Sequence, residues 1–160
     1  GGWLLAGAAL CGGRAYALLA DFFAQTARMM GMDTNAPYAA MEGLLKSADR
    51  PEDVPTVLPL FEGTRQDSTQ TGSITGLTAE NFTPLHLIYG MMDGMAHELH
   101  QMYQAYRAAG GTAKKLIGSG GGLRNNRFLC ESFSRVFDSA IILSDGREEA
   151  ACGAALYAAD

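Results

Sequence analysis

One stretch, residues 115–126, constrains the fold of this chain more than any other, and it reads KLIGSGGGLRNN. A short apolar strand leads into a turn with three consecutive glycines, and the turn opens a helix. Glycine permits a positive φ and lets a ligand approach the main chain. The start of a helix offers unpaired N–H groups and a positive dipole end to an anion. This strand–turn–helix arrangement predicts a nucleotide-binding turn.

Length and composition set the outer limits. The chain has 160 residues and a hydrophobic content of 48%, which suits one globular domain over residues 1–160. Its net charge of −5 indicates no basic patch, so we expect no nucleic-acid partner. The longest strongly apolar run, residues 3–11, is too short to cross a bilayer, so we expect no membrane partner. The few, widely spaced cysteines favour reduced thiols in a cytoplasmic protein.

Hydrophobic periodicity predicts helices that alternate with short strands. Helices are expected at 14–30, 36–48 and 148–159, from Pro84 to Gly110, and from the glycine turn to Phe137. Strands are expected at 3–10, 58–64, 73–77, 115–119 and 140–143, with a proline-rich connector at 49–59. The last four elements alternate as β-α-β-α, which predicts a parallel strand pair under helices. The expected class is therefore α/β, a mixed sheet with flanking helices.

The glycine turn has several alternative interpretations. Glycine turns also arise for purely steric reasons, so a turn without a ligand is one of them. A dinucleotide fingerprint requires a further glycine where Leu123 or Asn125 stands. Asp145 nevertheless occupies the place of a ribose-binding acid, so an NAD-dependent oxidoreductase remains an alternative. A P-loop requires lysine and a hydroxyl residue where Leu123 and Arg124 stand. What remains is a turn that approaches a nucleotide by its backbone, with Asn125 facing the base.

Several further segments carry a family resemblance together with the turn GSGGGLRNN at 118–126. The segment SDGREEAACGAA follows at 144–155, and PLFEGTRQD, GSITGL and NFTP precede the turn at 59–67, 72–77 and 81–84. In this combination the chain resembles the C-terminal domain of the FGGY carbohydrate kinases, which have the actin-like ATPase (ribonuclease H-like) fold. LCGGRAYALL at 10–19 is most similar to the sedoheptulokinase branch of that family. The resemblance covers almost the whole chain.

The resemblance implies that ATP, together with Mg²⁺, is the cofactor and that the glycine turn holds the adenosine part. Gly121 and Asn125 match the family positions that contact adenine. Gly120 and Gly122 shape the same turn, and Gly118 completes the expected nucleotide-binding set.

The resemblance also implies which parts of the site lie elsewhere. In the family the catalytic aspartate and a phosphate-binding turn belong to the preceding segments, so we expect no catalytic residue within this chain. The chain would be the larger part of an ATP-binding domain, incomplete at its N-terminal end and inactive alone. The full-length enzyme would phosphorylate a sugar hydroxyl, with sedoheptulose or another ketose favoured. A stand-alone actin-like nucleotide-binding or scaffolding domain is the alternative, and the oligomeric state stays open, a homodimer included.

Other patterns have ordinary structural interpretations. His97 and His100 stand three apart rather than the four of a zinc-protease helix, so we expect a solvated helix face and no metal. Arg65 and Asp67 suggest an ion pair, which is worth little at a surface. Packing is the expected role of the small-residue stretch 153–155, of the methionine row and of the later cysteines: Met91, Met92, Met95, Met102, Cys130 and Cys152.

Overall fold

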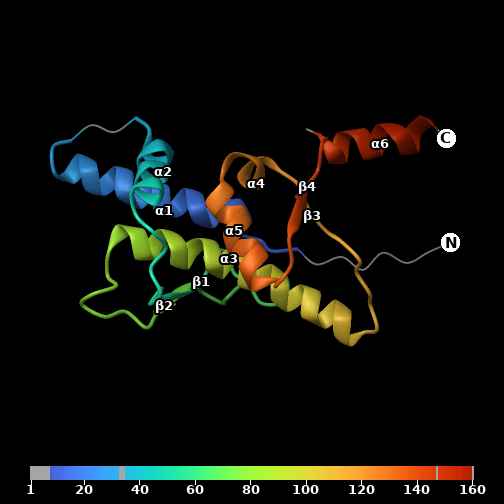
Figure 1. Cartoon of the computed structure of the whole chain (residues 1–160), viewed down its shortest axis with the longest axis horizontal. Helices are drawn as coiled ribbons and strands as arrows, with labels where there is room; N and C mark the ends of the chain where they lie inside the picture. The colour runs from blue at the N-terminus through green and yellow to red at the C-terminus, as the bar shows by residue number, and fades with distance from the viewer. Residues whose placement is uncertain (1–7, 33–34, 147, 160) are drawn as a thin grey trace.

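The computed structural model describes residues 8–32, 35–146 and 148–159. In these ranges the helices are α1 (Gly12–Met29), α2 (Pro37–Ser47), α3 (Pro84–Ala108), α4 (Gly121–Asn125), α5 (Arg127–Val136) and α6 (Glu149–Ala159) (Figure 1). The strands are β1 (Thr56–Leu58), β2 (Ser73–Thr75), β3 (Leu116–Gly118) and β4 (Ile141–Leu143). The helices expected at 14–30, 36–48 and 148–159 are confirmed to within two residues at each end.

Helix α3 is the longest element, with 25 residues, and it organises the fold. Thr83 caps its N-terminus by accepting a hydrogen bond from the backbone N–H of His86 at 3.4 Å, and Pro84 begins the first turn, as predicted. Residues 87–96 are buried on every side because α1, α2, α5 and β1 all pack against this helix. Figure 1 shows α3 running along the molecule with α1 and α5 above it.

Strand β1 crosses α3 at two glycines. A Cβ atom at Gly94 would lie 2.3 Å from the carbonyl oxygen of Val57, and one at Gly90 would lie 2.8 Å from that of Pro55. The missing side chains therefore let the strand and the helix approach closely. On its other side β1 pairs antiparallel with β2, and Val57 lies opposite Ile74.

Strands β3 and β4 form the parallel pair that the alternating pattern predicts. Leu116 lies opposite Ile141 and Gly118 opposite Leu143, while α4 and α5 form the crossover between them. The described residues contain two separate two-stranded sheets rather than one mixed sheet. The α/β class is therefore confirmed, whereas a single sheet is not.

Three predicted elements have different bounds. The strand expected at 58–64 covers Thr56–Leu58 instead, because Pro59 has no N–H to donate and Gly63, with φ +70, turns the chain back. The single helix expected to run to Phe137 is interrupted at Asn126, whose φ of −133° and ψ of 96° are not helical. Residues 8–10 of the strand expected at 3–10 are not in a strand, and residues 3–7 lie outside the described ranges.

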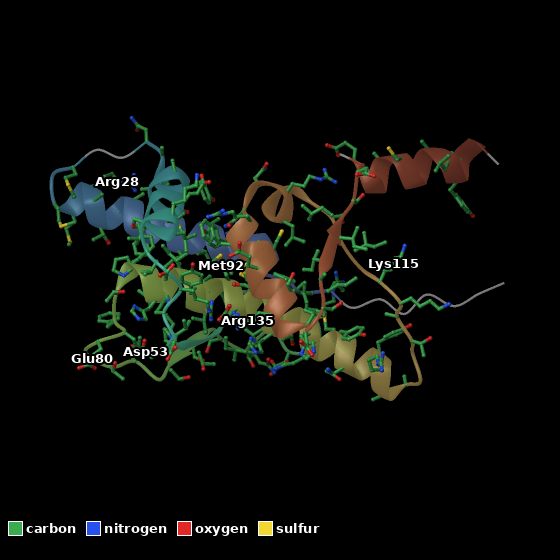
Figure 2. All side chains as sticks on the ribbon, in the orientation of Figure 1. Arg28, Asp53, Glu80, Met92, Lys115 and Arg135 are labelled. Atoms are coloured by element: carbon green, nitrogen blue, oxygen red, sulfur yellow. The ribbon has the colours of Figure 1, made fainter. Side chains whose placement is uncertain are left out.

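A charged cluster in the core joins three segments. The side chain of Asp93 on α3 belongs to a residue only 9% exposed. Its carboxylate accepts two hydrogen bonds from Arg50, from Nη2 to Oδ2 at 2.5 Å and from Nη1 to Oδ1 at 3.3 Å. Arg135 of α5, labelled in Figure 2, donates to Oδ1 as well. The cluster ties the connector before β1 to α3 and to the helix that follows the glycine turn.

Helix α6 extends away from the other elements (Figure 1). Its Leu156 and Tyr157 are 72% and 88% exposed, and Cys152 is exposed as well. A Cβ atom at Gly153 would meet nothing within 4 Å. The expectations that 153–155 pack closely against a sheet and that Cys152 is buried are therefore wrong for this structure. Despite its small apolar residues α6 is no membrane helix, since no helix in the described ranges has the length and hydropathy to span a bilayer.

Candidate nucleotide site

Two glycines of the predicted set, Gly118 and Gly120, shape the backbone of the turn. Gly120 has φ +95°, a conformation that favours glycine, and its carbonyl accepts a hydrogen bond from the N–H of Arg124 at 3.2 Å as α4 begins. Gly118 is buried, and a Cβ atom there would lie 2.7 Å from Cγ2 of Ile141 and 3.0 Å from Cδ1 of Leu123. Neither glycine borders the cavity in front of the turn.

The other three predicted residues, Gly121, Gly122 and Asn125, border a cavity of about 720 Å³. Its opposite walls come from the start of α1, from α2 and from the middle of α3. A cavity of this size lies within the range of small-molecule sites. Segments that are far apart in the sequence therefore meet at this cavity.

Gly121 leaves room toward this cavity. The nearest atom to a Cβ placed at Gly121 would be Nδ2 of Asn125 at 3.8 Å, which is an ordinary van der Waals contact. The protein itself thus tolerates a side chain at this position.

Asn126, next to the predicted Asn125, has a role that the sequence interpretation missed. Its Oδ1 accepts a hydrogen bond from the N–H of Leu129 at 3.1 Å and so caps α5. Its Nδ2 donates to the hydroxyl of Tyr16 at 3.4 Å. An asparagine just before an amphipathic stretch is a recognisable N-cap signal, but the partner lies 110 positions away along the chain.

Tyr16 and Tyr38 form an aromatic wall of the cavity, with ring centroids 6.2 Å apart and an interplanar angle of 21°. Burial raises the pKa of Tyr16, and the hydrogen bond from Asn126 opposes this shift. Gly12 and Gly13, which lie in the same segment as Tyr16 and were given no role from sequence, also border the cavity. The wall gives the cavity an aromatic side against which an aromatic ligand can pack.

The cavity is poor in carboxylates. Among its described lining residues only Glu42 carries one, and its Oε1 lies 2.6 Å from Nζ of Lys46. Mg²⁺ needs several oxygen ligands in octahedral geometry. The described ranges also hold no group of three or more His, Cys, Asp or Glu side chains that could bind a metal ion. The described lining residues therefore offer no cluster of side chains that would hold Mg²⁺ without further ligands.

His97 and His100 of α3 have separate partners. Nδ1 of His97 lies 2.9 Å from the carbonyl oxygen of Asp93, one turn earlier. Nε2 of His100 lies 2.9 Å from Nε2 of Gln104. Both side chains are thus engaged in contacts within their own helix.

Two other roles that the sequence suggested, an ion pair for Asp67 and ribose binding for Asp145, are not seen. Asp67 accepts hydrogen bonds from the backbone N–H and the hydroxyl of Thr69, at 2.9 and 2.6 Å, and these bonds lower the pKa of Asp67. Across the described ranges no ion pair joins Asp67 to Arg65. Asp145 is exposed and is not among the described residues that border the cavity, so it is not placed as a ribose-binding acid.

The profile of the FGGY family of carbohydrate kinases, C-terminal domain, matches residues 1–159. The chain belongs to this family. The FGGY domain is 28% identical over 93 residues to a protein named xylulose kinase from Bacillus subtilis (strain 168), a match that covers 58% of this chain and 18% of the relative.

Solved structures with a similar fold are also named as kinases. The FGGY domain matches xylulose kinase from Rhodospirillum rubrum with a TM-score of 0.68 and 24% identity, over 82% of this chain and 25% of the other. It matches Plasmodium falciparum glycerol kinase with ADP with a TM-score of 0.58 and 19% identity, over 86% and 27%. The chain thus spans about a quarter of their length. The family prediction is confirmed, whereas the sedoheptulokinase branch and the ribonuclease H-like assignment stay predictions.

Proposed function

We propose that this FGGY domain holds the adenosine part of ATP in the cavity beside the glycine turn. The observation that carries the proposal is the meeting of Gly121, Gly122 and Asn125 with the aromatic wall of Tyr16 and Tyr38. A purine base packs against the edges of aromatic rings and has donors and acceptors that an asparagine amide can pair with. A glycerol kinase of similar fold has been solved with ADP, which agrees with this assignment.

The domain would be the ATP-binding part of a carbohydrate kinase that transfers the γ-phosphate to a ketose hydroxyl. Phosphoryl transfer depends on positioning and on charge stabilisation. The cavity offers positioning of the nucleoside, so the catalytic aspartate, Mg²⁺ and most sugar contacts are expected in an N-terminal domain of a longer, cytoplasmic enzyme. The domain alone would then bind ATP or ADP without transferring phosphate.

Sedoheptulose is the favoured sugar, because residues 10–19 resemble that branch of the family. The names of the relatives make xylulose the next sugar to test. A phosphorylation assay of the full-length protein with sedoheptulose, xylulose and glycerol decides between them. If no sugar is phosphorylated although ADP binds, the protein is a nucleotide-binding or scaffolding domain instead.

Nucleotide binding can be tested by calorimetry with ATP, ADP and NAD. Gly121→Val should abolish ADP binding, because the protein has room for a Cβ at this position but the branched side chain would occupy the place where the nucleotide approaches the backbone. Gly43→Val is the matched control, since Gly43 is exposed on α2, does not border the cavity and has nothing within 4 Å of a Cβ among the described residues. Asn125→Ala should weaken ADP binding by about ten- to a hundredfold, the loss of one or two hydrogen bonds. Heat with NAD and none with ADP would overturn the proposal.

A further inference from the structure

We propose that the hydroxyl of Tyr16, oriented by Asn126, donates a hydrogen bond to a ring nitrogen of the bound purine. The inference rests on the proposed function, and it adds a base-recognising residue that comes from α1 rather than from the glycine turn. It follows from the direction in which each hydrogen bond in this corner of the cavity must run.

The orientation of the Asn126 amide is set by its backbone partner. The N–H of Leu129 can only donate, so the atom of Asn126 that faces it at 3.1 Å must be the oxygen. The NH₂ group therefore points the other way, toward the hydroxyl oxygen of Tyr16 at 3.4 Å and the sulfur of Met92 at 3.9 Å.

The direction of the second hydrogen bond follows from the first. An amide NH₂ group can only donate, so the phenolic oxygen of Tyr16 is the acceptor. The proton of that hydroxyl is then free to be donated elsewhere. Within the described ranges Tyr16 has no other hydrogen-bond partner, and its side chain borders the cavity.

The ring of Tyr16 is held in place as well. It stacks against Tyr38 with an angle of 21° between the rings, and the residue is half-buried at the base of α1. Burial raises the pKa of Tyr16, which keeps the hydroxyl neutral and able to donate at physiological pH. A neutral donor in a largely apolar cavity suits a neutral acceptor, and the ring nitrogens of adenine are acceptors of this kind.

The first experiment measures ADP binding to the whole chain by calorimetry. Tyr16→Phe should weaken binding about three- to tenfold, the value of one hydrogen bond. Tyr103→Phe is the matched control, because Tyr103 is also half-buried, does not border the cavity and has no hydrogen bond to its hydroxyl among the described contacts. This control should bind ADP as the wild type does.

A second variant tests the orienting role of Asn126. Asn126→Asp keeps an oxygen to cap α5 but has no N–H, so the hydroxyl of Tyr16 would turn and donate to the carboxylate. Tyr16→Phe should then cause no further loss of ADP affinity in the Asn126→Asp background. An equal loss in both backgrounds would show that Asn126 does not orient the hydroxyl and would overturn this part of the proposal.

The acceptor atom is identified with 1-, 3- and 7-deaza-ADP, each of which lacks one ring nitrogen. The effect of Tyr16→Phe should vanish for one analogue and persist for the other two, a pattern that a merely structural tyrosine would not produce. If Tyr16→Phe binds ADP as tightly as the wild type, or if its loss persists with all three analogues, this inference is wrong and the nucleotide site stands. If the wild type does not bind ADP at all, the proposed function fails and this inference with it.

Discussion

Replacing Asp93 by asparagine should destabilise the domain by about 3 kcal/mol. Removing one partner of a buried ion pair costs about 3–5 kcal/mol, because a charge is left without compensation. The carboxylate of Asp93 is nearly inaccessible, but the side chains of Arg50 and Arg135 are 29% and 44% exposed. Since both cations can regain water, we place the loss at the lower end of that range.

The same geometry divides this loss between the two arginines. Arg135 is more than a third exposed, so its pair with Asp93 resembles a surface ion pair, and Arg135→Gln should cost about 1 kcal/mol or less. Arg50 is more buried and holds the carboxylate with two bonds, and its guanidinium also lies 4.9 Å from the ring centre of Tyr89. Arg50→Gln should therefore cost about 2 kcal/mol.

Urea unfolding followed by circular dichroism measures these losses. The expected order of destabilisation is Asp93→Asn, then Arg50→Gln, then Arg135→Gln, at an unchanged m-value. In 1 M NaCl the Arg135 contribution should shrink while that of Arg50 persists, because exposed pairs are screened more strongly. A loss below about 1 kcal/mol for Asp93→Asn, or Arg135→Gln as the most destabilising change, would refute the view that burial sets these energies.

Two further variants test packing and burial. Gly94→Ala should destabilise the domain by about 1–3 kcal/mol, because its Cβ would lie 2.3 Å from the carbonyl oxygen of Val57. Gly43→Ala, at an open position of α2, should be neutral or stabilising. Equal unfolding midpoints of the two variants in urea would contradict the close approach of β1 to α3. Burial raises the pKa of Glu98, whose Oε2 is buried and has no hydrogen-bond partner among the described residues, so the folded state holds this proton to higher pH than the unfolded state does. The free energy of unfolding should fall as pH rises from the pKa of Glu98 in the unfolded state to its pKa in the folded state. Because Glu98→Gln does not titrate, its stability relative to the wild type should increase over that pH range. A difference in urea midpoints between the two proteins that stays constant from pH 4 to 7 would contradict this.

Local patterns predicted most of the elements correctly. The helical spacing after Gly13, the Thr83-Pro84 start and the β-α-β-α order all depend on neighbours within a few residues, and each is confirmed. The wrong bounds arise where one residue overrides the pattern. Pro59 ends a strand that apolar alternation would continue, and Asn126 interrupts a helix because its amide bonds to the backbone of Leu129 instead.

The candidate site was predicted from one side only. Gly121, Gly122 and Asn125 lie within one short, recognisable motif, and all three border one cavity. The opposite wall, with Tyr16 and Tyr38, stands in helices that carry no local sign of a ligand. An aromatic residue on a helix is as common in a core as in a site, so sequence alone had no reason to select these two.

The amino-acid sequence by itself determined the family and the strand–turn–helix unit with its glycine turn. These properties are local, because they depend on backbone conformation and on residues a few positions apart. The tertiary structure alone decided that Asp93 receives two arginines and that Asn126 meets Tyr16. Such contacts join residues roughly 40 to 110 positions apart, and they form because packing around α3 brings these polar side chains together where little water reaches them.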